Sequence, residues 1–452
     1  MSQISHIKYK DIIEAGRFDA DFFKPEYLDI DDLIYKKNKK TLAELSEKIT
    51  DFWAYSQNNF IVYKNEWTHY FIRNQDITDF FINDENRIFI DEDVYKKLSL
   101  KLDIYDILLQ RTWSIWKSAI VLERDIPSSA NQNLAQVKLK KDIINPFYIL
   151  TYLNCYFWKK YFERLATGNV QPRLNLQQID KIFIPIFSEN FQKQIEEIVK
   201  NSYKRQIESK YLYQEAEDLL LTELWLKNHT VSHTLTFSTT KKAVDEAWRY
   251  DADYFQPKYD ELIEKIENYK WGWDYVENCI KVQDKNFIPE GWKLYKYIAL
   301  ANVSAQWFIS DCEENYWENL PTRARRILHK WDVIVSSIEW SLSSCAVIED
   351  EFDWWLCSNW FYVLNSDFFN SECLLVLFKS KIIQTLLKKW CSWTILTAIS
   401  KDELNKIKLP LINSWLQKKI SDKIKESFRL RNESKELLEQ AKKMVEDEIE
   451  KE

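Results

Sequence analysis

The sequence predicts an α+β fold: a tandem repeat of two strand-rich domains separated by two long antiparallel helices that form a coiled coil. Three observations predict this fold. The segment EAGRFDADFFKPEY at 14–27 returns as EAWRYDADYFQPKY at 246–259. Short apolar runs, alternating or β-branched, follow each copy. Each half then closes with a helical segment whose apolar and small residues recur at heptad spacing.

The apolar runs of both halves are typical of short strands separated by turn residues. They read NNFIVY, THYFIRNQDI, NRIFI, DILLQR, SAIVLE and LAQVKL in the first half, and KYIALANVS, DVIVSS, CAVI and FYVL in the second. Apolar helical patterns follow at 144–166 and 371–389. We therefore predict strand-rich domains at 1–187 and 229–412, with long helices at 188–228 and 413–452.

The two closing helices share a heptad seam in which apolar and small residues step by four and three. Small side chains at matching steps would let two helix backbones approach closely. Helices of about 35 residues would be roughly 50 Å long, so a pair could hold the two domains at a fixed distance. The alternative is two solvated helices that pack separately on their own domains. The predicted seam consists of Ile195, Val199, Ser202, Ser209, Ala216, Leu220, Ile420, Ile424, Ser427, Ser434, Leu438 and Ala441.

Tryptophan stands where a repeated protein would be expected to carry glycine. The chain has 4 Gly and 20 Trp, although Gly is ordinarily about 7% of a globular sequence. In the repeats, Gly16 is opposite Trp248, and Gly168 is opposite Trp393. The turn TWSIWKSAI at 112–120 holds two indoles where small residues are favoured. One hypothesis explains all of this: the gene reads UGA as glycine but was translated with UGA as tryptophan. Genuine enrichment in tryptophan is the alternative.

Composition limits the class of protein. The hydrophobic and charged fractions, 46% and 29%, are those of a soluble globular chain, and no apolar run approaches the roughly 20 residues of a membrane span. Seven scattered Cys without a CxxC pair indicate reduced thiols, so we expect a cytoplasmic protein with no membrane association. A net charge of −7 argues against a protein that coats nucleic acid, although local basic patches remain possible.

Motifs of catalysis and cofactor binding are absent from the sequence. There is no phosphate-binding GxxxxGK[ST] loop and no GxGxxG turn, even with Trp read as Gly. INPFY at 144–148 lacks the second Pro of the adenine methyltransferase motif, and is interpreted as the start of a helix. His229 and His233 lie in a linker-like segment, so we predict no metal site. We expect a chain that is not an enzyme and holds no cofactor.

Polar turns at equivalent places in the two halves are the remaining candidate site. Amides and guanidinium groups suit base edges, whereas hydroxyls and ammonium groups suit phosphates. For any single residue, a turn-capping role is an equally good interpretation. In the first half the candidate DNA contacts are Arg73, Asn74, Gln75, Arg111, Thr112, Ser114, Lys117, Asn131, Gln132, Asn133, Asn169, Gln171 and Arg173. In the second half they are Asn302, Ser336, Ser337, Ser341, Ser343, Ser358, Asn359 and Thr394.

These motifs resemble the DNA-specificity subunit of type I restriction-modification systems over essentially the whole chain. The resemblance lies in DILLQRTWSIWKSAI read with glycines, in TGNVQPRLNLQQIDKIFIPIF, and in CSWTILTAISKDELNKIKLPLI with the helix that follows. Tryptophan at the family's glycine positions is the departure from that pattern.

The resemblance implies a function for each part of the chain. Each strand-rich half would be a target-recognition domain that reads one part of a bipartite site in double-stranded DNA. The helices would set the spacing and dock two adenine methyltransferase subunits, which restriction (translocase) subunits join. S-adenosylmethionine, ATP and Mg²⁺ would then belong to those partners. A two-domain coiled-coil scaffold that does not bind DNA is the alternative.

Overall fold

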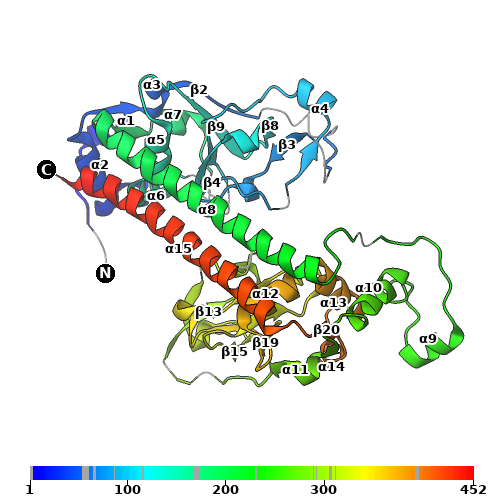
Figure 1. Cartoon of the computed structure of the whole chain (residues 1–452). Helices are drawn as coiled ribbons and strands as arrows, with labels where there is room; N and C mark the ends of the chain where they lie inside the picture. The colour runs from blue at the N-terminus through cyan, green and yellow to red at the C-terminus, as the bar shows by residue number, and fades with distance from the viewer. Residues whose placement is uncertain are drawn as a thin grey trace. The chain divides into compact units, whose positions relative to one another are not determined.

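The computed structural model describes residues 4–52, 61–64, 68–85, 87–112, 117–166, 173–229, 232–288, 290–291, 293–304, 308–310, 312–391 and 397–451. It divides into two compact units. Unit 1 comprises residues 1–206 and 432–452, and unit 2 comprises residues 207–431. Both units combine strand-rich sheets with parts of the long helices α8 (Glu189–Glu223) and α15 (Ser414–Glu450), so the predicted α+β fold is confirmed (Figure 1).

The described residues of unit 1 form three sheets. A five-stranded sheet has the order β2-β9-β6-β7-β4, a three-stranded sheet has the order β5-β3-β8, and β1 pairs with β10. The strands are β1 (Lys39–Thr41), β2 (Ser46–Asp51), β3 (His69–Ile72), β4 (Phe80–Phe81), β5 (Phe89–Ile90), β6 (Ile107–Gln110), β7 (Ser118–Ile120), β8 (Ser128–Ala130), β9 (Leu134–Leu139) and β10 (Phe183–Pro185). The helices are α1 (Tyr9–Ala15), α2 (Pro25–Tyr35), α3 (Leu42–Leu45), α4 (Glu92–Lys97), α5 (Pro146–Tyr152), α6 (Tyr156–Leu165) and α7 (Leu176–Asp180).

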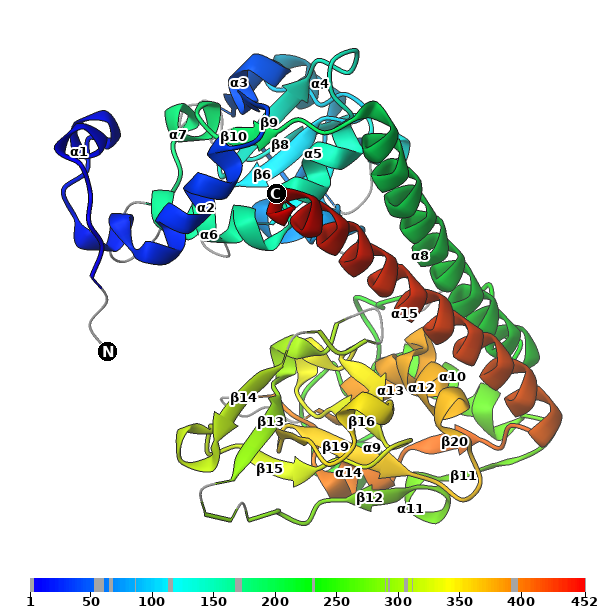
Figure 2. The same ribbon diagram turned by 90° about the vertical axis from the view of Figure 1, so that its left-hand side faces the viewer.

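Unit 2, whose strands are shown in Figure 2, has most of this topology, but among its described residues it lacks a counterpart of β4 and adds β15 beside β18. Its sheets have the orders β12-β19-β16-β17 and β14-β13-β18-β15, and β11 pairs with β20. The strands are β11 (Trp273–Tyr275), β12 (Lys281–Gln283), β13 (Leu294–Ile298), β14 (Glu313–Tyr316), β15 (Ala324–Ile327), β16 (Val333–Ser336), β17 (Cys345–Val347), β18 (Leu356–Ser358), β19 (Phe361–Asn365) and β20 (Lys408–Pro410). The helices are α9 (Lys241–Ala247), α10 (Pro257–Glu267), α11 (Val276–Cys279), α12 (Ser371–Lys379), α13 (Lys381–Trp390) and α14 (Lys401–Asn405).

Successive side chains of the central strand of each unit lie in two different hydrophobic cores, because neighbouring side chains of a strand point to opposite faces of the sheet. In unit 1, Ile107 and Leu109 of β6 pack with α5, α6 and the long helices, whereas Leu108 packs toward the second sheet. In unit 2, Val333 and Val335 of β16 face the helices and Ile334 faces the second sheet. The same arrangement therefore arises twice from the same sequence pattern.

The long helices pack antiparallel within each unit. In unit 1, the Ser202 hydroxyl donates to the Ser434 carbonyl oxygen at 3.0 Å, and Arg205 pairs with Glu433 at 3.0 Å. In unit 2, the hydroxyls of Ser209 and Ser427 each donate to the other's carbonyl oxygen, at 2.7 and 2.8 Å. All the predicted seam residues are buried except Leu438, which is half-buried against the unit 1 core. The contacts divide each long helix between the two units: residues up to 206 of α8 and from 432 of α15 belong to unit 1, and the remaining residues of both helices belong to unit 2.

Four exposed tryptophans have the left-handed backbone that favours glycine. Among the described residues, Trp225, Trp248, Trp331 and Trp354 have φ values of 58°, 52°, 72° and 64°. Trp248 ends α9 just as Gly16, with φ 63°, ends α1. At the counterpart of Trp331, however, unit 1 carries Tyr105 with φ 72°, so that turn does not itself require glycine.

Trp225 closes α8 in the hydrogen-bonding pattern of a Schellman motif. The Leu226 N–H donates to the Leu221 carbonyl oxygen at 2.8 Å, across the left-handed residue. The Trp225 ring is 85% exposed, so its packing does not compensate for the backbone strain. Trp113, Trp116 and Trp393 lie outside the described residues, and the UGA hypothesis stays a prediction there.

Candidate nucleic-acid interface

Three strand ends meet at one edge of unit 1. Strands β3 and β8 are parallel, so the residues that follow them lie at the same edge. The Asn131 N–H donates to the Ile72 carbonyl oxygen at 2.9 Å. The Arg111 N–H, directly after β6, donates to the Asn133 carbonyl oxygen at 3.0 Å.

A fourth segment completes this edge. The Leu174 N–H donates to the Arg111 carbonyl oxygen at 3.1 Å, and Thr112 forms a β-bridge with Arg173. The Asn74 side-chain amide donates to the Thr112 carbonyl oxygen at 3.2 Å. The structure therefore brings together predicted residues that are far apart in sequence. We call residues 73–75, 111–112, 131–133 and 173 the unit 1 edge.

Unit 2 has the same backbone arrangement. The Ser337 N–H donates to the Trp360 carbonyl oxygen at 2.8 Å, and the Ile399 N–H donates to the Ser337 carbonyl oxygen at 2.9 Å. Ile338 forms a β-bridge with Ala398, as Thr112 does with Arg173. We call residues 299–302, 337–338, 358–360 and 398 the unit 2 edge.

The side chains on the two edges differ although the backbone bonds match. The Arg111 guanidinium is 5% exposed, forms an ion pair with Asp51, and donates through Nε to the Leu174 carbonyl oxygen at 3.0 Å. Its counterpart Ser337 donates its hydroxyl to the Trp360 carbonyl oxygen at 2.8 Å. Arg111 therefore ties the unit 1 edge together through its side chain, a role that its sequence position did not indicate.

Arg73 and Asp76 form a local ion pair at the start of the 3₁₀ turn after β3. The guanidinium nitrogen and carboxylate oxygen are 2.9 Å apart, and Asp76 also accepts the Arg73 N–H at 2.8 Å. In unit 2, the Asn302 side chain accepts the Ala299 N–H at 2.7 Å in the same way. Asn302 is thus the structural counterpart of Asp76.

The remaining predicted contacts differ in accessibility. Ser336 and Ser358 are fully buried, and the Ser341 hydroxyl lies 2.8 Å from that of Ser336. Gln75, Ser343 and Asn359 are exposed, whereas Gln132 is half-buried. The Lys117 ammonium lies 3.8 Å from Asp79. Ser114, Asn169, Gln171 and Thr394 lie outside the described residues. As DNA contacts, all these residues stay a prediction.

Arg323 is a candidate contact that the sequence analysis did not select. Its guanidinium lies 4.5 Å from the centre of the Trp360 ring, and its carbonyl oxygen accepts the Asn359 N–H at 2.8 Å. A stacked guanidinium keeps its N–H groups available for hydrogen bonds in its own plane. The run TRARR at 322–326 was the available signal, but its place beside the unit 2 edge depends on the pairing of β15 with β18.

Among the described residues, Cys155 and Cys345 are buried cysteines. Burial raises the pKa of the Cys155 and Cys345 thiols to about 12, so both are neutral at physiological pH. Across the described part of the chain, no three His, Cys, Asp or Glu side chains cluster in a way that could hold a metal ion.

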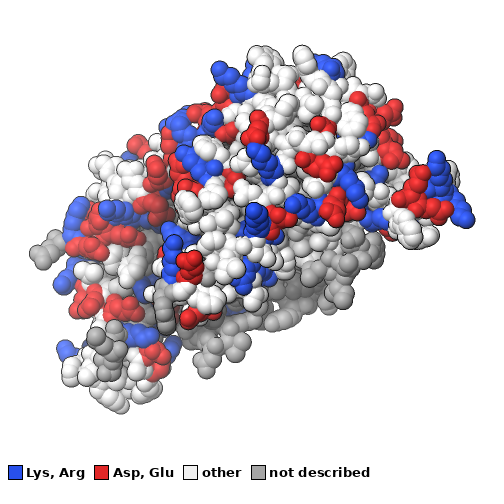
Figure 3. Space-filling model, turned by 90° about the horizontal axis from the view of Figure 1, so that it is seen from below, with Lys and Arg blue, Asp and Glu red and all other residues white. Residues whose placement is uncertain are grey.

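The described helices include none with the length and apolarity needed to cross a membrane. Acidic and basic side chains are interspersed on the face in Figure 3.

Comparison with known proteins finds likenesses among solved structures. The chain is similar to the S subunit of a type I restriction-modification system from M. genitalium, with 12% identity, a TM-score of 0.43, and coverage of 91% of this chain and 94% of that one. It is also similar to the HsdS subunit from Thermoanaerobacter tengcongensis, with 12% identity, a TM-score of 0.29, and coverage of 90% and 95%. No family model and no curated protein sequence matches the chain.

Proposed function

We propose that the chain is the sequence-specific DNA-binding subunit of a type I restriction-modification complex. Each unit would read one half of a bipartite site in double-stranded DNA. One observation carries the proposal: two backbone hydrogen bonds and a β-bridge recur at both edges, whereas the side chains on the two edges differ. Such a pair suits two domains of common architecture that recognise different sequences.

The other parts of the proposal concern the helices and partners. The seam of α8 and α15 would set the distance between the half-sites and dock two adenine methyltransferase subunits, which restriction subunits would join. Methyl transfer from S-adenosylmethionine, and DNA cleavage with ATP and Mg²⁺, would belong to those partners.

Single-molecule sequencing of adenine methylation tests the proposal. DNA is taken from a host that carries the adjacent methyltransferase gene, with and without this chain. Methylation at one bipartite, asymmetric motif only in the presence of the chain is the expected result. Exchange of residues 229–412 for those of a related chain should then change one half of the motif and leave the other half intact.

The scaffold alternative predicts a different outcome. If the methyltransferase is active but the methylated motif is the same with and without this chain, the proposal is contradicted. Salt-insensitive duplex binding would point the same way, because phosphate contacts release counterions and make binding steeply salt-dependent.

A further inference from the structure

A lysine-rich groove lies beside the turn that follows β16 in unit 2. The groove has a volume of about 340 Å³ and lies between the start of α10, the turn Glu339–Ser343 and one face of α13. Lys258, Lys381 and Lys388 line it from two of these elements. No part of this groove belongs to the candidate contacts above except Ser343.

The amphipathic pattern of α13 directs its polar face into the groove. Ile382, Ile383, Leu386 and Leu387 are buried in the unit 2 core. Positions 381, 385 and 388 therefore share the opposite face of the helix, since residues three and four apart are neighbours. Both Lys381 and Lys388 are exposed.

Two side-chain hydrogen bonds fix the turn against the helices. The Gln384 side-chain amide donates to the Leu342 carbonyl oxygen at 2.8 Å, and the Lys379 ammonium donates to the Ser343 carbonyl oxygen at 2.9 Å. The exposed Ser343 side chain is thus held beside the lysines by bonds that do not depend on a ligand. A hydroxyl and several ammonium groups on a fixed frame are the groups that bind phosphate oxygens.

The carboxylates around the groove only partly balance its lysines. Lys388 lies 3.6 Å from Glu339, Lys258 lies 3.8 Å from Asp253, and Lys389 lies 3.5 Å from Asp260. Of these three pairs, only Lys388–Glu339 has a lysine side chain that is more than half exposed. An exposed pair at such a distance contributes little stability and can be replaced by a stronger anion. Within the described residues, Lys381 has no ion pair.

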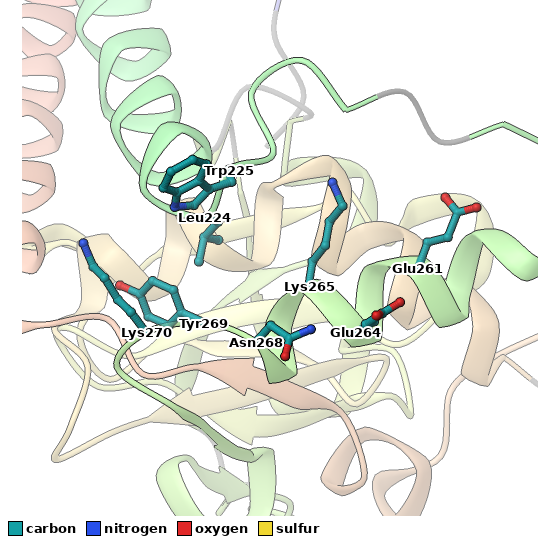
Figure 4. Close-up of a pocket in the computed structure, with 8 residues that line it drawn as sticks. All are labelled: Leu224, Trp225, Glu261, Glu264, Lys265, Asn268, Tyr269 and Lys270. Atoms are coloured by element: carbon teal, nitrogen blue, oxygen red, sulfur yellow. The ribbon is translucent and has the colours of Figure 1, made fainter.

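Two other surfaces carry a more even balance of charges than this groove. A larger groove of about 660 Å³ at the end of α8 is lined by Glu261, Glu264, Lys265 and Lys270, so its charges balance (Figure 4). In unit 1, the counterpart of Lys388 on α6 is Glu163, which pairs with Lys160 at 3.1 Å. Lys160 also lies 3.3 Å from Glu26, so its charge is already neutralised.

We propose that the α13 groove binds the phosphate backbone of double-stranded DNA and positions unit 2 on its half-site without reading bases. This inference rests on the proposed function. According to this inference, unit 2 makes more contacts with DNA phosphates, which do not depend on the base sequence, than unit 1 does. Phosphate contacts fix register and orientation, whereas base contacts carry specificity.

The test measures duplex affinity against salt for the full chain assembled with its methyltransferase. The double variant Lys381→Gln/Lys388→Gln should reduce the magnitude of the slope of log K against log [salt] by about 2, since each lost phosphate contact removes about 0.9. The methylated motif should stay the same. The matched control is Lys159→Gln/Lys160→Gln on α6, for which we expect no comparable change in slope.

Three results would contradict the inference. They are an unchanged slope in the groove variant, an equal change in the control, or a groove variant that methylates an altered motif. Failure of the proposed function is separate: it would appear in the wild-type complex as equal binding to motif and scrambled duplexes. A charge-reversal variant, Lys381→Glu/Lys388→Glu, should weaken binding further and by the same factor on both duplexes.

Discussion

The two edges show the same backbone supported by different side chains. In unit 1, a buried Arg111 reaches Asp51 and the Leu174 carbonyl oxygen, and so links three segments. In unit 2, Ser337 makes one short bond to the Trp360 carbonyl oxygen. The comparison teaches that backbone hydrogen bonds maintain the repeated architecture, whereas side chains are free to differ where recognition is proposed.

The largest expected effect distinguishes these two supports. Arg111→Ala would leave the Asp51 carboxylate unpaired at 15% exposure, so we expect a loss of about 3–5 kcal/mol in the free energy of unfolding. Ser337→Ala removes one hydrogen bond and should cost about 1 kcal/mol. Urea denaturation of the two variants measures both values. Equal losses would show that Arg111 does not hold the unit 1 edge together.

A second prediction compares the two parts of the helix seam. The reciprocal bonds of Ser209 and Ser427 should make Ser209→Ala/Ser427→Ala cost about 2 kcal/mol, or about 1 kcal/mol for each buried hydrogen bond. Ser202→Ala in unit 1 should cost about 1 kcal/mol. Hydrogen exchange of α8 amides on either side of residue 207 would report the two losses separately. A double variant as stable as the wild type would rule out a structural role for these hydroxyls.

The smallest predicted effect is a gain in stability. Trp225→Gly relieves a left-handed backbone at an exposed side chain, so we expect stabilisation by about 1 kcal/mol. Trp415→Gly provides the control, because this exposed residue lies in the first turn of α15 without a left-handed backbone, where glycine relieves no strain and should cost up to about 0.5 kcal/mol. Thermal unfolding distinguishes the two changes in sign.

Mass spectrometry of the native protein tests the UGA hypothesis directly. Peptides that cover residues 225 and 248 should carry glycine masses if the hypothesis holds. Tryptophan masses at both positions would end the hypothesis and leave two strained helix ends in the native chain. The sequence aligned Gly16 with Trp248, and the structure gives both residues a positive φ.

Local patterns were sufficient to predict most elements of the fold. Short apolar runs, alternating or β-branched, predicted β6, β9 and β16, and helical periodicity predicted α5 with α6 and α12 with α13. Heptad spacing predicted the buried seam. In each case the signal is written into consecutive residues, because the buried face is set by the periodicity of the element itself.

The sites depend on contacts that no local pattern encodes. Asp51 is 60 residues from Arg111, and only the arrangement of β2, β6 and β9 brings the two side chains together. The lysines of α13 appeared in sequence only as the polar side of an apolar helix. Their proximity to the turn Glu339–Ser343 depends on the packing of three separate elements. Tertiary packing therefore decided which polar residues form a site.

The division of the chain into units has a consequence for its synthesis. Unit 2 is continuous from 207 to 431, whereas the unit 1 core includes Ala441, Val445 and Ile449 from the last turns of α15. Domains generally fold as units while the chain emerges. The unit 1 core is therefore incomplete until the residues of α15 that follow unit 2 have been synthesised. Until then, of the two long helices, its residues can pack only against α8. A premature stop after residue 431 would spare the second unit and leave the first incomplete.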